Sequence, residues 1–450
     1  MNLRIQRLWE ALNGSYWFIP TLMSGASVAL SVGLAQVDAR LRREMVEEIG
    51  WIFTGGPEGA RAVLSTIAGS MITVAGVAFS VLIVALSLAS SQFGPRILRN
   101  FMQDRGNQVV LGAFTGTFLY CLLILRTIRG EENADFVPHL SITVAVALAI
   151  ISLGVFIFFI HHSAVSIQAP VVISEIAREL RHSIDRRFPD SAGVAPEGEA
   201  SPLPPGFSEE ATPILSLADG YLQAIDEDEL LETACEHDLV MELELRPGHF
   251  VVCGTPLVRV SPAPGVTGEV CKRLQGAFSL GRQRTQTQDV EFSIRQLVEI
   301  AVRALSPSVN DPFTAINCLD YLGAAIIQMA RVQLPPRHRI DASGSLRIIM
   351  NPVTFAGATD AAFDQIRQHG REDVAVTLHL LEVLAGVALS LRDPERRAVI
   401  RRHAEMVWRS GMEATPEPRD RDEVDQRFRL VLRALGEAGE PAGAEHPRSL

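Results

Sequence analysis

The sequence is almost without lysine: of its 41 lysine and arginine residues, only Lys272 is a lysine. A phosphate-binding loop of the Gly-Lys-Ser/Thr type is therefore excluded. A biotin or lipoate carrier is excluded as well, because no lysine stands at a hairpin tip. Cysteine is also scarce, and the five cysteines form neither a C-x-x-C pair nor a zinc-binding spacing. Isolated thiols of this kind are typical of a reducing cytoplasm.

Positive charge is in deficit overall, since the formal net charge is −11 at pH 7. A nucleic-acid-binding protein carries a basic field, so we expect no nucleic-acid partner. No nucleophile elbow, glycine-rich dinucleotide loop, H-E-x-x-H sequence or kinase motif occurs either. We therefore predict no catalytic residue, no metal site and no cofactor, and the expectation leans against an enzyme.

Apolar residues are abundant: they make up 47% of the chain and gather in the first 160 positions. Four blocks contain no charged residue and no histidine: 16–37, 62–90, 109–125 and 140–160. A helix needs about 20 apolar residues to cross a bilayer, so the blocks predict four transmembrane helices. Transporters that couple to protons usually carry ionisable residues inside the membrane, which makes a proton-coupled pump unexpected here.

Arginine residues set the predicted orientation in the membrane. Arg4 and Arg7 precede the first block, three arginines lie between the second and third blocks, and more follow the fourth. Acidic residues accompany the arginines of the other two loops. This bias predicts a multi-pass protein of the bacterial inner (plasma) membrane with both termini in the cytoplasm.

The second block carries a stripe of small and hydroxylated residues in a heptad frame. The stripe includes Thr66, Gly69, Thr73, Gly76, Ser80 and Ser87. Such a face can pack closely against another helix, with its hydroxyls bonded across the contact or to the carbonyl four residues earlier. It can also face water and line a pore at the axis of a homo-oligomer. Both interpretations stay open.

The chain is expected to combine an α-helical integral membrane domain of four transmembrane helices with a cytoplasmic α+β domain. The predicted divisions are a transmembrane domain at 1–160, a helical stalk at 161–188, a linker rich in Pro, Gly, Ser and Glu at 189–213, the α+β domain at 214–435 and a disordered tail at 436–450.

A second candidate site lies in the α+β domain, around GRQRTQTQDVEF and SPSVNDPFTA. Its polar residues are Arg282, Arg284, Gln288, Asp289, Asn310 and Asp311. Guanidinium groups bind phosphate bidentately, so the cluster could hold a small anion or a nucleotide. It could instead be a structural hydrogen-bond network, in which Asp311 and Pro312 are the N-cap and first residue of a helix.

Three stretches carry a resemblance to a known family: SMITVAGVAFSVLIVALSLASSQFGPRILRNFMQDRGNQVVLGAFTGTFLYCLLILRTIR, then RPGHFVVCGTPL, then GRQRTQTQDVEFSIRQLVEIAVRALSPSVNDPFTA. They resemble bacterial predicted membrane proteins of domain of unknown function 2254, over roughly residues 10–400. The resemblance implies an integral inner-membrane protein with a cytoplasmic C-terminal domain, and it brings no activity or catalytic residue.

Two functions follow as expectations. The first is a homo-oligomeric, channel-like or transport-related protein in the lipid bilayer, regulated by its cytoplasmic domain. The alternative is a membrane-anchored signalling or scaffold protein whose cytoplasmic domain binds a small anion or a protein partner.

Overall fold

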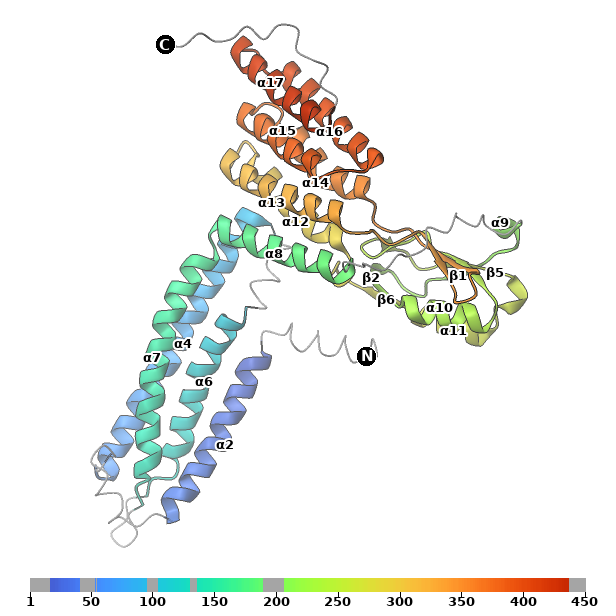
Figure 1. Ribbon diagram of the computed structural model, residues 1–450. Coiled ribbons are helices and arrows are strands. Elements are labelled where there is room, and N and C mark those ends of the chain that lie inside the picture. Colours follow the sequence, from blue (N-terminus) through green and yellow to red (C-terminus); the bar gives the residue numbers. More distant parts are fainter. Residues whose placement is uncertain are drawn as a thin grey trace. The chain divides into compact units, whose positions relative to one another are not determined.

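The chain forms two compact units, Met1–Val171 and Val172–Leu450. The computed structural model describes residues 17–40, 53, 55–94, 104–129, 136–188 and 206–436 (Figure 1). Most of the predicted linker at 189–213 and nearly all of the predicted tail at 436–450 lie outside these residues. The finer domain divisions drawn from the sequence stay predictions.

Four long helices make up the described part of the first unit. They are α2 (Phe18–Arg40), α4 (Pro57–Phe93), α6 (Arg105–Leu125) and α7 (His139–Ser166). Helix α6 packs against the other three, and half of its apolar span is buried. Short alanine side chains of α4, such as Ala68 and Ala75, meet Tyr120 and Phe114 of α6, so the two backbones run close together.

Polar side chains tie the ends of these helices. The carboxylate of Asp38, near the end of α2, accepts hydrogen bonds from the backbone nitrogens of Leu140 (3.0 Å) and Ser141 (2.9 Å), and also from the Ser141 hydroxyl. It therefore acts as an N-cap for α7 from another helix. At the start of α6, Asp104 accepts from the Gly106 nitrogen and pairs with His162 of α7 at 2.6 Å.

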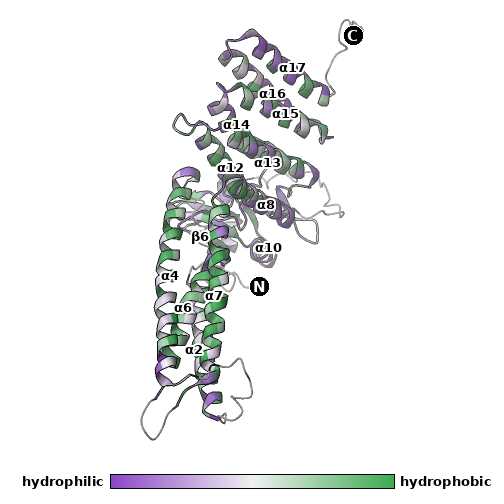
Figure 2. Cartoon of the chain, turned by 90° about the vertical axis from the view of Figure 1, so that its left-hand side faces the viewer, coloured by the Kyte–Doolittle hydropathy of each residue, from purple (hydrophilic) through white to green (hydrophobic). Residues whose placement is uncertain are grey.

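Apolar residues predominate along these four helices, as the hydropathy colouring shows (Figure 2). Within the described residues, five helices are long and apolar enough to cross a membrane: α2, α4, α6, α7 and α13 (Pro312–Arg331). Length and composition alone therefore do not confirm the predicted count of four. Helix α13 differs in its surroundings, because it packs against α12 (Val290–Ala304), α14 (Phe355–Gly370) and α15 (Val374–Leu389) of the second unit.

The second unit begins with most of α8 (Ala169–Arg187), followed by a β-rich part. One sheet has the order β1-β5-β3-β8-β7, and a second has the order β4-β2-β6. The strands are β1 (Thr212–Leu215), β2 (Gly220–Ile225), β3 (Val240–Glu242), β4 (Phe250–Val251), β5 (Pro256–Ser261), β6 (Phe278–Gly281), β7 (His338–Ile340) and β8 (Leu346–Ile349). Among the described strands, only β3 and β8 pair in parallel. The short helices are α9 (Phe207–Glu210), α10 (Glu227–Glu236), the 3₁₀ turn η1 (Ala263–Gly265) and α11 (Gly268–Gly276). Helices α10 and α11 pack on the apolar core around Leu230, Met241 and Leu274.

The rest of the second unit is a stack of three helix pairs (Figure 1). The pairs are α12 with α13, α14 (Phe355–Gly370) with α15 (Val374–Leu389), and α16 (Pro394–Ala414) with α17 (Pro418–Ala434). The first helices of the pairs contact one another, and so do the second helices. This nearest-neighbour arrangement is the geometry of α-solenoids. The fold is therefore a helical N-terminal region and a C-terminal α+β region, as predicted, although the stacked pairs were not foreseen.

Candidate functional site

The predicted stripe of α4 lies on the outside of the first unit. Thr66, Gly69, Thr73, Gly76, Ser80 and Ser87 are all exposed. The face that packs within the chain is a different one, built from residues such as Leu64, Ala68, Ala78 and Ala85. The described helices of this chain therefore do not cover the stripe.

Three of the four hydroxyls of the stripe bond to their own helix. Thr66, Thr73 and Ser80 donate to the carbonyl oxygens four residues earlier, at 2.7, 2.8 and 2.9 Å. A Cβ added at Gly69 or Gly76 would meet no atom within 4 Å. The stripe is therefore an open, narrow face on which the hydroxyls of Thr66, Thr73 and Ser80 need no outside partner.

Two other faces of the same unit make this stripe distinctive. On α6, added Cβ atoms at Gly112 and Gly116 would lie 2.5 Å from Met23 Sδ and 2.6 Å from Ser27 Oγ, so those glycines already serve close contact with α2. On α7, the outward face is bulky: the exposed fractions of Ile150 and Ile157 are 67% and 64%. That composition suits a lipid-facing surface, whereas the stripe on α4 does not match it.

In the second unit, Arg284 and Asp289 of the predicted polar cluster form a closed pair. Arg284 donates from Nε (2.9 Å) and a terminal nitrogen (2.6 Å) to one oxygen of Asp289, whose other oxygen caps α12 through the Phe292 nitrogen at 3.1 Å. Burial raises the pKa of Asp289, and the charge of Arg284 opposes that shift. Arg284 also lies over the Phe292 ring. Both side chains are thus occupied in starting α12.

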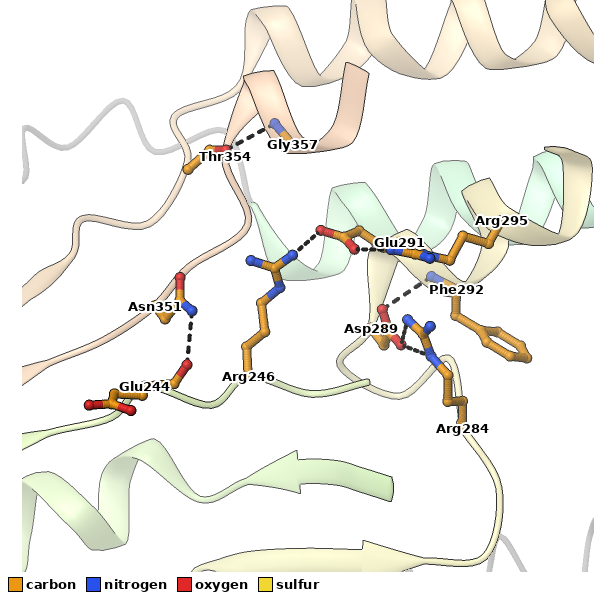
Figure 3. Close-up of polar contacts among 10 residues, drawn as sticks. All are labelled: Glu244, Arg246, Arg284, Asp289, Glu291, Phe292, Arg295, Asn351, Thr354 and Gly357. Atoms are coloured by element: carbon orange, nitrogen blue, oxygen red, sulfur yellow. Dashed lines mark hydrogen bonds and ion pairs between the residues drawn. The ribbon is translucent and has the colours of Figure 1, made fainter. Parts of the chain in front are cut away.

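The stretch RPGHF packs directly on this pair. Gly248 has φ +97°, and a Cβ there would lie 2.3 Å from the Asp289 carboxylate. Arg246 reaches from its loop to Glu291 at the start of α12 (2.6 Å), where Arg295 also pairs with Glu291 at 3.5 Å (Figure 3). Two of the stretches that carry the family resemblance therefore meet around the first turn of α12.

The other residues of the predicted cluster are dispersed. Gln288 is bonded to both backbone groups of Ile225 (2.9 and 3.0 Å), and Arg282 is exposed after β6. Asp311 caps α13 through the Thr314 nitrogen at 3.2 Å, with Pro312 as the first helical residue, as predicted. Helix α12 has 15 residues, so Asn310 and Asp311 lie about 22 Å from Asp289 along it. The six residues do not form one site.

A pocket beside this region gathers charged residues that the sequence did not single out. Its lining includes Arg187 from the end of α8, Glu227 from α10, Arg246, and Arg339 from β7. Arg187 and Arg339 each donate to one oxygen of Glu227, at 2.7 and 2.9 Å. These residues come from four distant segments, so no local spacing could have revealed them; the one signal was Arg246, next to the Pro-Gly turn.

Within the described residues, no group of three or more His, Cys, Asp or Glu side chains could hold a metal ion. His379 instead lies between two carboxylates, Asp320 at 2.6 Å and Glu382 at 3.4 Å. In the pocket, Arg187, Arg246 and Arg339 outnumber the carboxylate of Glu227, so the pocket is suited to holding an anion.

Comparisons with known proteins identify the family of this chain. Residues 13–386 match the family described as Predicted membrane protein (DUF2254). The chain belongs to this family. Uncharacterized proteins of Mycobacterium bovis and Mycobacterium tuberculosis are each 33% identical to it over 425 residues, which is 93% of this chain and 80% of each relative. No solved structure matches this DUF2254 chain. The resemblance drawn from its motifs is thus confirmed.

Proposed function

We propose that this DUF2254 protein is a homo-oligomeric, channel-like protein of the bacterial inner membrane, in which the α4 stripe faces the central axis. The observation that supports it is the position of the stripe: its small and hydroxylated residues point away from every described helix of their own chain. A second copy could then bring equivalent stripes together around an axis.

Four helices span the membrane in this proposal: α2, α4, α6 and α7. Helix α13 is excluded because its apolar residues Cys318, Leu322 and Ile326 are fully buried in the stack of helix pairs. The arginine bias of the loops supports cytoplasmic termini, and with them a cytoplasmic second unit.

Thiol labelling tests which environment the stripe faces. In a background without the five native cysteines, single cysteines at Thr73, Ser80 and Ser87 are exposed to a membrane-impermeant thiol reagent in proteoliposomes. We expect labelling at these positions and none at Ile150→Cys, the matched control on the bulky face of α7. Protection of all three α4 positions, without oxidative cross-linking between copies, would exclude both a pore and a subunit contact at the stripe.

Ion flux tests conduction itself. Ser80→Leu places a bulky group on the stripe and is expected to reduce flux in proteoliposomes, whereas Ile150→Leu is expected to leave it unchanged. If the protein conducts none of the ions tested, or if the two variants behave alike, the channel-like role must be abandoned.

The alternative function is a signalling or scaffold protein whose cytoplasmic unit binds a small anion. The pocket lined by three arginines favours this role, and of the cluster predicted from the sequence it contains Gln288 alone. A ligand in that pocket could equally regulate a channel, so the two proposals are compatible.

A further inference from the structure

The arginine pocket holds more positive charge than its carboxylates neutralise. Glu227 is shared by Arg187 and Arg339, and Glu291, which lies beside the pocket, is shared by Arg246 and Arg295. Each carboxylate thus serves two guanidiniums, and each set keeps a positive charge. This excess is notable in a chain whose net charge is −11.

Most hydrogen-bond donors of the three lining arginines are unused within the described residues. A guanidinium carries five N–H groups. Arg187, Arg246 and Arg339 each make one hydrogen bond, in every case from the same terminal nitrogen to a carboxylate. The Nε and the second terminal nitrogen of each side chain remain for a ligand, and these are the groups that form bidentate contacts with phosphate.

The pocket also has a firm frame. Pro247, Pro335, Pro336 and Pro352 lie in its lining, and proline fixes the backbone φ angle. The ion pairs hold the guanidiniums half-buried, so little side-chain freedom is left to lose on binding. Apolar side chains such as Val290 and Met350 complete the lining, which lowers the local dielectric and strengthens attraction to an anion.

We propose that this pocket binds the phosphate group of a small ligand, with Arg187, Arg246 and Arg339 as the residues that hold it. Glu227 occupies Arg187 and Arg339 while the pocket is empty and competes with the phosphate for them. When phosphate binds, Arg187 and Arg339 exchange contacts with Glu227 for contacts with the phosphate. The pocket lies where α8, α10, β7 and the start of α12 meet.

The inference deepens the ligand-binding alternative above and does not depend on the channel-like role. A chain without conduction could still bind phosphate here, and a conducting chain without phosphate binding would refute only the pocket. The phosphate could belong to a soluble compound or to a lipid headgroup, and the two sources are separated by experiment.

The test uses the full chain in nanodiscs and the midpoint of its thermal unfolding, each variant being compared with itself without phosphate. In phosphatidylcholine nanodiscs, inorganic phosphate is titrated against sodium chloride of equal ionic strength. We expect a saturable rise of the midpoint, with affinity about ten- to a hundredfold weaker in Arg339→Gln. Arg259→Gln is the control, because Arg259 is paired with Glu244 outside the pocket.

The second arm replaces phosphatidylcholine by phosphatidylglycerol and omits inorganic phosphate. A stabilisation confined to this arm and lost in Arg339→Gln supports the proposal with a lipid as the source. The proposal is overturned if neither arm shows a midpoint shift that is lost in Arg339→Gln. It is also overturned if Arg259→Gln loses the shift to the same extent.

Glu227→Gln provides a test that a purely structural ion-pair network would fail. Removing the competing carboxylate charge is expected to lower the dissociation constant for phosphate, even if the variant unfolds at a lower temperature. A dissociation constant that is unchanged or raised in Glu227→Gln refutes the proposal.

Discussion

Glycines on two helices of the first unit are expected to differ in how strongly the same substitution destabilises a single chain. A Cβ at Gly116 would lie 2.6 Å from Ser27 Oγ, and one at Gly112 would lie 3.2 Å from the Pro20 backbone. Atoms in good contact lie about 3.5–4.0 Å apart, so at Gly116 the contact must open by about 1 Å. Overpacking of this kind costs about 1–3 kcal/mol, and we expect that loss of stability for Gly116→Val.

The same change on α4 meets open space. Gly69→Val and Gly76→Val add side chains where no atom lies within 4 Å, so the expected change within one chain is no more than about 0.5 kcal/mol. If the stripe joins copies of the chain, these two variants should instead dissociate the oligomer.

Two measurements in detergent separate these effects: thermal unfolding of the monomeric fraction, and molar mass by light scattering. The reasoning predicts a lower unfolding midpoint for Gly116→Val and a lower molar mass for Gly69→Val. A monomer destabilised equally by both substitutions would refute it, because α4 would then be packed on its outer face by its own chain.

Three further predictions concern single polar or strained positions. Asp38→Ala should lower the unfolding free energy of the first unit by about 2–4 kcal/mol, because it leaves buried N–H groups at the start of α7 without an acceptor; Asp38→Asn should cost less in the same denaturation assay. Burial lowers the pKa of His403, so the unfolded chain binds a proton at this residue more readily than the folded chain does. The free energy of unfolding should therefore fall as the pH drops below about 6.5, and it should fall less steeply in His403→Gln. Thermal melts from pH 8 to 5 measure both effects. Gly248→Ala should cost at least about 2 kcal/mol more than Gly254→Ala in unfolding experiments, because both positions have positive φ but only the first crowds Asp289.

Local signals in the sequence predicted local structure well. Asp311 and Pro312 start α13 as expected from their cap and first-turn preferences. The strand orders of the two sheets could not be predicted, because runs of two to six residues are too short for alternation to identify their partners. The predicted cluster joined residues that are near in sequence, yet α12 separates Asp289 from Asp311.

The pocket could not be predicted for the opposite reason: its arginines are near in space and far apart in sequence. Arg187, Arg246 and Arg339 come from a helix, a loop and a strand, and they lie side by side only once the second unit has folded. Sequence periodicity reports the faces of single elements, and it carries no information about which distant faces meet.

The stripe on α4 is not packed by any described helix of its own chain. Close packing through glycine is used elsewhere in the first unit, at Gly112 and Gly116, and bulky apolar residues cover the outward face of α7. A stripe facing lipid would be expected to resemble the face of α7, since a narrow groove leaves lipid chains poorly packed. Thr73 and Ser80 donate their hydroxyl hydrogen bonds to carbonyl oxygens of α4 itself, so these groups stay satisfied when a second α4 helix excludes water from the stripe. The same hydroxyls can bond to water if the two helices separate. A channel that opens and closes along a central axis would need a face of this kind, which can contact another α4 helix when the channel is closed and water when it is open.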